Sequence, residues 1–390
     1  MKILVLPSWY PPQGGTFFRD YCEAFHHKGI DICVIAISII SMRRITLSDI
    51  FESFRIKVCN ESGITVLRTN YLKLPKLERI NMRLWAGKMT KVCNYFLRNY
   101  QKPDIIHVHS AIWAGLPGIS LAKKMNIPIV ITEHRGRFVY NNPYATTLLK
   151  AWHVNILKNI FNQKVQIITV SNSLKRNLDA TFSPAMPIKV IGNFANPDFF
   201  APSHGNPNKT FTFLTVASLE FYKGIDVLLD AYSLFTKQYG NTQLIIAGSG
   251  EMHQQLKNKS NVLKINNVIF TGQLSKEKIR ENLQSANTFI LPSRFEAFGV
   301  AIIEAMACGL PVIATKSGGP EDIITDKSLG ILVEKNDPDA LAKAMEAMFN
   351  NYIDYHRQKI REYFIANYSP DIITKKYMEV FNQMLTSEKA

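Results

Sequence analysis

Residues 289–311 read FILPSRFEAFGVAIIEAMACGLP, and they indicate the fold of the whole chain. The apolar run that ends at Pro292 has the length and composition of a strand buried on both faces of a parallel sheet. A loop follows, and residues 300–308 then have helical composition. We expect this helix to end at Gly309, because glycine followed shortly by proline is a common stop signal. Strand, loop and helix in this order form the repeating unit of an α/β fold.

Two acidic residues stand in this segment, Glu296 in the loop and Glu304 inside the helix. Their spacing is too long for two carboxylates that touch along a helix, so each is expected to address a different part of one ligand. The free N–H groups at the helix start, near Phe298 and Gly299, form an anion site. A carboxylate for sugar hydroxyls, a helix N-terminus for phosphate and a second carboxylate for ribose together predict a nucleotide-sugar site.

This segment and the SGGPEDII that follows at 317–324 resemble the E-x7-E signature of retaining glycosyltransferases, most closely those of family 4. An alternative interpretation is that both acids are merely solvated. The apolar neighbours of Glu304, among them Ile302 and Met306, favour a site, because a buried carboxylate without a partner is costly. The resemblance implies an α/β fold of the GT-B type. In that fold two Rossmann-like, doubly wound domains face a cleft, and a C-terminal helix crosses back to the first domain.

A chain of 390 residues suggests two domains of ordinary size. Residues 201–208 are rich in Pro, Gly, Ser and Asn, which places a domain boundary near 200–209. We expect a first domain at 1–200, joined by crossing helices at 352–390, and a nucleotide-sugar-binding domain at 201–351. Strand and helix patterns alternate in both parts, which predicts parallel sheets.

The net charge of +15 is placed unevenly along the chain. Residues 1–200 contain 26 basic and 11 acidic residues, whereas residues 201–390 contain 20 of each. The first half should therefore be attracted to an anionic surface. No nucleic-acid-binding motif accompanies the charge, so an anionic membrane leaflet is the expected partner and nucleic acid is not. We expect a cytoplasmic protein that lies peripherally on the inner face of the membrane.

Two segments of the first half mix basic and apolar residues. Residues 38–60 are predicted to form either an amphipathic element that touches a membrane or an ordinary surface helix or loop. Residues 74–100 predict a long helix with an apolar stripe. We expect that stripe, which includes Leu77, Ile80 and Leu84, to face the core; a membrane face is the alternative interpretation.

The opening of the chain also predicts part of the site. A short strand leads to a loop that ends in Gly14 and Gly15, and a helix at 16–28 follows, with Phe17 among its expected core residues. By resemblance to family 4, the two glycines approach the donor diphosphate and the acceptor. A plain turn is the alternative interpretation.

Histidines follow or interrupt two further strands of the first half. His107 and His109 are two residues apart on one predicted strand and should share a face. The family has a similar H-x-H beside the acceptor cleft. His134 follows the next strand, at the strand end where α/β sheets bind ligands. It resembles the family histidine that contacts the donor sugar and the acceptor, and Arg135 is a further acceptor-side candidate. The alternative for His134 is a hydrogen-bonded loop residue.

Residues 217–224 read ASLEFYKG and lead into a helix. A lysine at a helix start, here Lys223, suits a phosphate. Family 4 usually has G-R-L-x-x-x-K-G at this place, where the arginine and the lysine hold the diphosphate. Ser218 stands at the arginine position and can donate a hydrogen bond but no charge. Arg294 or another cation is expected to replace the arginine. Gly248 begins a G-x-G turn that serves either packing near the base or sugar or the turn alone.

The resemblance implies a retaining, hexosyltransferase-type enzyme that moves a sugar from a UDP- or GDP-sugar to a saccharide or lipid-linked saccharide. The expected process is surface polysaccharide synthesis, such as that of lipopolysaccharide or capsule. His134, Glu296 and Lys223 are the expected catalytic residues, and the donor-binding set adds Gly14, Gly15, Ser218, Gly248, Arg294, Phe298, Gly299 and Glu304. Neither a metal nor another cofactor is expected.

Five scattered cysteines without a C-x-x-C pair argue against a zinc site or a disulfide framework. Two other functions stay open. One is a nucleotide-sugar epimerase with the same fold, which would release a changed sugar without an acceptor. The other is a non-catalytic protein that binds partners through its basic surface.

Overall fold

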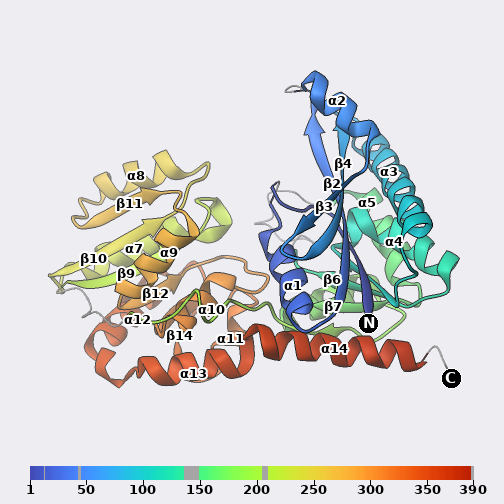
Figure 1. Cartoon of the computed structure of the whole chain (residues 1–390). Helices are drawn as coiled ribbons and strands as arrows, with labels where there is room; N and C mark the ends of the chain where they lie inside the picture. The colour runs from blue at the N-terminus through green and yellow to red at the C-terminus, as the bar shows by residue number, and fades with distance from the viewer. Residues whose placement is uncertain (13, 43–44, 136–148, 204–209, 388–390) are drawn as a thin grey trace.

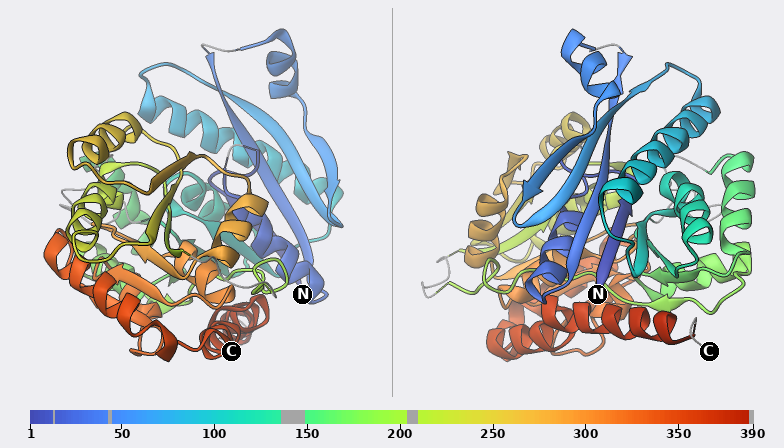
Figure 2. Two further views of the ribbon diagram at one scale, coloured as in Figure 1. Left: turned by 90° about the vertical axis from the view of Figure 1, so that its left-hand side faces the viewer. Right: turned by 45° about the vertical axis from the view of Figure 1, so that its right-hand side comes forward.

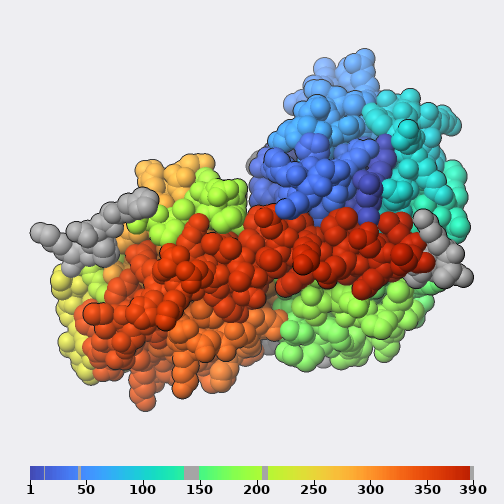
Figure 3. Space-filling model, turned by 60° about the horizontal axis from the view of Figure 1, so that its bottom comes forward, coloured from blue at the N-terminus to red at the C-terminus, as the bar shows by residue number. Residues whose placement is uncertain are grey.

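The computed structural model describes residues 1–390 except 13, 43–44, 136–148, 204–209 and 388–390. Two α/β domains stand side by side, and the last two helices of the chain run along one end, one beneath each domain (Figure 1). The view of that end shows these helices as a continuous ridge from one domain to the other (Figure 3).

The first domain is built on an eight-stranded sheet with helices on both faces (Figure 2). All neighbouring strands are parallel except β3 and β4. The strand order is β3 (Lys57–Glu61), β4 (Ile64–Lys73), β2 (Asp31–Ser41), β1 (Lys2–Pro7), β5 (Ile105–His109), β6 (Ile129–Glu133), β7 (Gln166–Thr169) and β8 (Lys189–Val190). Its helices are α1 (Thr16–His27), α2 (Leu47–Phe54), α3 (Glu78–Asn99), α4 (Ala111–Met125), α5 (Ala151–Phe161) and α6 (Asn172–Phe182).

The second domain contains a six-stranded, fully parallel sheet. The strand order is β11 (Val268–Gly272), β10 (Thr242–Ala247), β9 (Phe211–Val216), β12 (Thr288–Leu291), β13 (Val312–Thr315) and β14 (Gly330–Val333). Its helices are α7 (Ile225–Phe235), α8 (His253–Val262), α9 (Lys276–Ser285), α10 (Val300–Ala307), α11 (Pro320–Ile323) and α12 (Pro338–Asn350). Strand β12 is buried along its whole length, as the apolar run before Pro292 predicts.

Two helices at the end of the chain join the domains. Helix α13 (Arg357–Tyr368) belongs with the second domain, where the Arg357 guanidinium donates to the Cys308 carbonyl at 3.3 Å. Helix α14 (Pro370–Ser387) packs on the first domain, where Tyr377 and Phe381 join the core beneath α1. The crossing expected from the sequence therefore occurs between α13 and α14.

The segment 38–60 differs from a single amphipathic element. It contains the end of β2, helix α2 and strand β3, and residues 43–44 lie outside the described part. Strands β2 and β4 run longer than their apolar cores predict, because they pair with each other as far as Ser41 and Lys73.

The expectation that the whole apolar stripe of α3 faces the core was wrong. Trp85, Met89 and Phe96 are buried, but Leu77, Ile80 and Leu84 are 45%, 44% and 50% exposed. The reason is rotational: Leu84 precedes Trp85, so it lies about 100° around the helix from the buried face.

Candidate functional site

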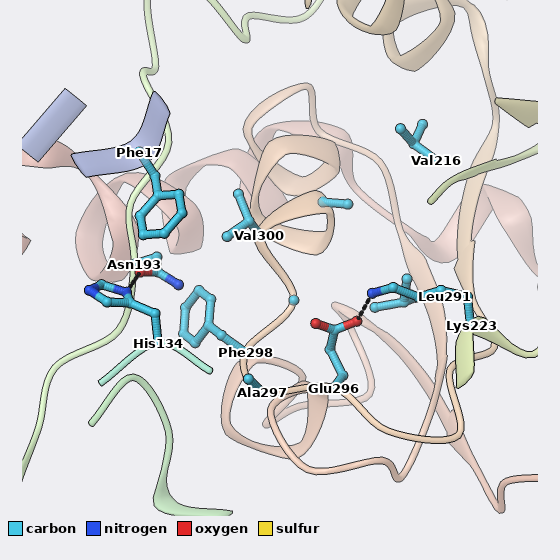
Figure 4. A pocket seen from close by; sticks show the side chains of 12 residues that line it. Phe17, His134, Asn193, Val216, Lys223, Leu291, Glu296, Ala297, Phe298 and Val300 are labelled. Atoms are coloured by element: carbon cyan, nitrogen blue, oxygen red, sulfur yellow. Dashed lines mark hydrogen bonds and ion pairs between the residues drawn. The ribbon is translucent and has the colours of Figure 1, made fainter. Parts of the chain in front are cut away.

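A cavity of about 240 Å³ lies between the two domains (Figure 4). The first domain contributes Phe17, His134 and Asn193 to its lining. The second domain contributes residues from the ends of β9 and β12 and from the start of α10: Val216, Lys223, Leu291, Glu296, Ala297, Phe298, Gly299, Val300 and Ala301. The carboxyl ends of parallel strands are where α/β sheets bind ligands, so the location is that of a substrate site.

Lys223 and Glu296 form an ion pair in this cavity. Lys223 Nζ lies 2.6 Å from Glu296 Oε2, and each side chain is only 15% exposed (Figure 4). Burial by itself lowers the pKa of Lys223, but the attraction of Glu296 and its hydrogen bond outweigh burial and raise the pKa above its ordinary value. Lys223 is therefore charged at neutral pH, and an incoming anion would meet an already partnered cation.

The backbone of Glu296 is fixed by the loop after β13. Its N–H donates to the Ser317 carbonyl at 3.0 Å, and its carbonyl accepts from Gly319 at 2.9 Å. Gly318 stands opposite with φ 128°, and a Cβ there would lie 2.7 Å from the Glu296 carbonyl oxygen. These bonds fix the backbone of Glu296 against the loop. The glycines of the SGGP sequence at 317–320 permit this close approach.

The start of α10 provides an anion site beside the ion pair. Gly299 precedes the helix with φ 107°, and no side chain caps the helix start in the described structure. The first N–H groups of a helix have no partner within it, and here Gly299, Val300 and Ala301 line the cavity. These donors are available to an anion.

Glu304 lies one turn further along α10, on the same face as Val300. Burial raises the pKa of its carboxyl to about 7, and nearby Lys276 opposes this shift. Lys276 itself lies 3.7 Å from Asp20 of α1, so this ion pair spans the two domains. Glu304 therefore lies in the gap between the domains but is not among the residues that line the cavity.

Arg294 does not reach the cavity, so the expectation that it replaces the missing arginine was wrong. Its guanidinium donates to both carboxylate oxygens of Asp226 at 2.7 Å each, and also to Asn336 at 2.7 Å. The guanidinium lies 4.0 Å from the ring centroid of Phe221. Asp226 stands in the first turn of α7, so Arg294 braces the turn that carries Lys223.

Ser218 and Gly248 line a second cavity, of about 330 Å³, which shares Val216 with the first. Gly248 has φ 146°, and a Cβ there would lie 1.8 Å from the Ala217 carbonyl oxygen. The glycine is therefore needed for the close approach of the turns after β9 and β10. Gly248 therefore both permits this close packing and lines the second cavity.

His134 follows β6 and borders the cavity. Its Nε2 lies 3.1 Å from Nδ1 of His109, and its Nδ1 lies 3.3 Å from Oδ1 of Asn193 (Figure 4). With a carbonyl oxygen opposite, Nδ1 carries the proton and Nε2 accepts from His109. Burial lowers the pKa of His134 to about 3, although the Asn193 hydrogen bond opposes this. The imidazole is therefore neutral at neutral pH and can act only through hydrogen bonds and shape.

His107 and His109 share one face of β5, as the strand period predicts, with ring centroids 4.2 Å apart. The expectation that they lie at the cleft was wrong, because both are fully buried. Strand β5 is central in its sheet, and α14 covers this face: the ring centroid of Tyr377 lies 5.5 Å from that of His107. His109 contacts His134, and the His107 Nε2 bonds to Thr132 Oγ1 at 2.8 Å. Both histidines therefore pack in the core against His134 or the strand before it, and they do not line the cavity.

Gly14 and Gly15 have φ 89° and 76°. A Cβ on Gly15 would lie 2.9 Å from the Trp9 ring, so this turn requires glycine. The Arg135 guanidinium lies 3.6 Å from the centroid of the same Trp9 ring. These residues thus form one cluster around Trp9 on the first-domain side, beside Phe18, which in turn contacts His134. Their contacts with the donor and the acceptor stay predictions.

Two first-domain residues of the cavity were missed from the sequence. Phe17 was expected in the core, but Phe18 takes that position and Phe17 faces the cavity. Asn193 follows β8 in the linker, and its position opposite His134 and 3.4 Å from the Tyr21 hydroxyl gives it a role in the site. For Phe17 the only sequence signal was its angular position on helix α1. For Asn193 it was the presence of an asparagine just after a strand.

No cluster of three or more His, Cys, Asp or Glu side chains that could hold a metal ion occurs among the described residues. The expectation that the donor binds without a metal stays a prediction.

Comparison with known families gives two matches that together span most of the chain. The model described as Glycosyltransferase Family 4 matches residues 14–199, and the model of group 1 glycosyl transferases matches residues 197–366. An uncharacterized glycosyltransferase of Methanocaldococcus jannaschii is 28% identical, over 96% of this chain and 94% of that protein. The putative teichuronic acid biosynthesis glycosyltransferase TuaC of Bacillus subtilis is 25% identical, over 88% of each chain.

Solved structures confirm the GT-B architecture. Sucrose-phosphate synthase from Thermosynechococcus elongatus superimposes with a TM-score of 0.81 at 21% identity, over 99% of this chain and 100% of that one. HepE from Anabaena in complex with UDP-glucose superimposes with a TM-score of 0.73 at 18% identity, over 98% of this chain and 100% of that one.

Proposed function

The chain belongs to the glycosyltransferases of family 4, and from this premise we propose that it is a retaining enzyme that uses a nucleoside-diphosphate sugar. The observation that carries the proposal is the interdomain cavity. There a charged lysine, a free helix N-terminus and a carboxylate line the same cavity as a neutral histidine.

The donor diphosphate would lie between Lys223 and the start of α10, because a full positive charge and free N–H groups meet there. Glu296 would accept hydrogen bonds from the sugar hydroxyls, and Glu304 from the ribose hydroxyls. The base would enter the adjoining cavity beside Ser218 and Gly248. Anabaena HepE in complex with UDP-glucose supports UDP as the nucleotide.

The chemistry would rest on electrostatic stabilisation of the leaving diphosphate. As the bond between the anomeric carbon and the phosphate oxygen breaks, negative charge grows next to Lys223 and the helix start. The acceptor hydroxyl attacks the same face of the sugar, and its proton passes to a phosphate oxygen of the donor. His134, being neutral, would orient the sugar or the acceptor through hydrogen bonds.

Lys223 is the one basic residue among the described residues that line the cavity. With Ser218 at the arginine position and Arg294 bound to Asp226, it would act without a second cation from the second domain. We therefore expect the activity to depend strongly on Lys223 alone.

The acceptor would be a saccharide or a lipid-linked saccharide for a surface polysaccharide such as lipopolysaccharide or capsule. The positive first half and the similarity to TuaC support this part of the proposal. The described residues contain no helix both long and apolar enough to cross a membrane. We propose a peripheral position on the inner face of the cytoplasmic membrane.

The serine at 218 favours one second candidate, a non-catalytic protein that keeps the fold. The deciding experiment is nucleotide release from a panel of UDP-, GDP- and ADP-sugars without acceptor, for the natural protein and for Glu304→Ala. Glu334→Ala is the matched control, since Glu334 is 65% exposed in the same domain. Slow release from one donor, lost only in Glu304→Ala, would support the enzyme. No release from any donor, with no thermal shift by any nucleotide, would contradict it, and a changed free sugar would indicate an epimerase.

A further inference from the structure

Helix α2 turns its apolar side to the solvent. Leu47, Ile50, Phe51 and Phe54 recur at the i, i+3, i+4 and i+7 spacing, so they lie on one face of the helix. They are 77%, 36%, 66% and 82% exposed, and none of the residues of α2, all of which the structure describes, is buried. A helix at the surface of a water-soluble domain normally turns such a stripe toward the core.

The polar side of α2 holds it in this orientation. The Glu52 carboxylate accepts from Asn70 at 3.2 Å, and the Lys88 ammonium of α3 donates to the Ser53 carbonyl. Just after the helix, the Thr69 hydroxyl donates to the Arg55 carbonyl at 2.7 Å. The apolar stripe is therefore directed outward by bonds on the opposite side of the helix.

The start of α3 adds a second mixed surface at the same end of the domain. Leu77, Ile80 and Leu84 are about half exposed there, and exposed basic residues alternate with them: Lys76, Arg79 and Arg83. Figures 1 and 2 show α2 and the start of α3 at the end of the first domain farthest from α14. We call this surface the apolar–basic face; it comprises Leu47, Ile50, Phe51, Phe54, Arg55, Lys57, Lys76, Leu77, Arg79, Ile80, Arg83 and Leu84.

The charge around this face is strongly positive. Within residues 42–91, the part that the structure describes contains nine basic and four acidic residues. Two of the acids are already neutralised, because Glu61 pairs with Arg68 and Glu78 pairs with Lys150. The excess charge is thus available to an anionic partner, while the apolar side chains need a partner that can accept them.

We propose that the apolar–basic face docks on an anionic lipid surface. The outward stripe of α2 would enter the boundary between headgroups and acyl chains, and the surrounding lysines and arginines would contact the phosphates. A second copy of this chain fits less well, because two like-charged surfaces would repel each other. This inference deepens the proposed function by naming the surface that meets the membrane, and lipid binding can be measured without any donor or acceptor.

The test is co-sedimentation of the full chain with vesicles of phosphatidylglycerol and phosphatidylcholine, compared with phosphatidylcholine alone. Phe51→Ser/Phe54→Ser removes apolar contact, and Lys76→Gln/Arg83→Gln removes charge. Val262→Ser/Ile353→Ser is the matched control, because these residues are 80% and 86% exposed on the second domain. Nucleotide release in lipid-free solution is measured for every variant and should not change.

We expect binding to the anionic vesicles that weakens at high salt, and a loss of at least about tenfold in both face variants but not in the control. Equal binding by Phe51→Ser/Phe54→Ser would overturn the proposal. A dimer in lipid-free solution that depends on Phe51 and Phe54 would also overturn it, as would RNA binding without vesicle binding. Because nucleotide release is measured separately, failure of the docking face and failure of the enzymatic proposal give different results.

Discussion

The Lys223 ammonium of the second domain lies 2.6 Å from the Glu296 carboxylate, across 73 residues of sequence, and both side chains border the interdomain cavity. The pair joins the turn before α7 to the loop after β12. The cation proposed for the diphosphate and the carboxylate proposed for the sugar are thus set side by side before any ligand enters.

Lys223→Met should lower kcat/KM for the donor by about 100-fold or more, because it removes the charge next to the leaving diphosphate. It should also cost about 1–3 kcal/mol in the free energy of unfolding, since Glu296 is left largely buried without its partner. Donor turnover and urea unfolding measure the two effects.

Lys316→Met is the control for this prediction. Lys316 lies at the same 2.6 Å from Glu334, but the two side chains are 48% and 65% exposed. An exposed pair contributes about 0–1 kcal/mol, so stability and turnover should hardly change. Equal losses in both variants would contradict a special role for Lys223.

The donor kcat/KM should rise with pH between about 6 and 8 if Glu304 binds the ribose. Burial raises the pKa of Glu304 to about 7, so its carboxyl is largely protonated at pH 6 and accepts fewer hydrogen bonds there. In Glu304→Gln the profile should be low and flat. A natural protein whose kcat/KM is constant over this range would argue against the assignment.

Arg294 and Asp226 should be strongly coupled in stability. Arg294→Met leaves the Asp226 carboxylate without its two 2.7 Å bonds and should cost about 3–5 kcal/mol. The double variant with Asp226→Asn should lose less than the sum of the single variants in a double-mutant cycle. The exposed pair Lys278 and Glu281 serves as the comparison and should be close to additive.

Two glycines should respond to alanine in opposite directions. Gly248→Ala would place a Cβ 1.8 Å from the Ala217 carbonyl oxygen and should cost more than about 2 kcal/mol. Gly87 lies inside α3 with open space around a built Cβ, so Gly87→Ala should stabilise by about 0.5–1 kcal/mol. Calorimetric melting temperatures distinguish the two, and a stable Gly248→Ala would disprove the close approach.

Acid should destabilise the first domain through its buried histidines. Burial lowers the pKa of His107 and of His134 from 6.5 to about 3. Below pH 6.5 these two histidines therefore bind more protons in the unfolded chain, and their contribution to the free energy of unfolding falls as the pH drops from 6.5 toward 3. At pH 5 each histidine should cost about 2 kcal/mol.

His107→Gln tests the source of this slope. Its amide nitrogen can replace Nε2 toward Thr132, but it does not titrate. The decline of stability between neutral pH and pH 5 should then be shallower than in the natural protein. An unchanged decline would mean that other groups cause it.

In the second domain, the strand and the helix on either side of Glu296 were predicted closely. Strand β12 occupies the apolar run at 288–291, and α10 ends at Ala307, one residue before the end of the helix predicted at 300–308. Both are short elements bounded by proline and glycine, whose backbone restrictions are local. The positions of Lys223, Glu296 and Gly299 in one cavity followed from the same local pattern and from the family resemblance.

The sequence by itself therefore determined the order of elements in the second domain, its parallel sheet and the chemistry collected at the end of β12, because periodicity and turn residues act over a few positions. Tertiary structure alone decided that Arg294 binds Asp226, that His107 and His109 are buried under α14, and that the stripe of α2 points outward. Each of these depends on contacts between segments far apart in sequence. A helix pattern shows which residues share a face, but only packing selects the face that meets the protein.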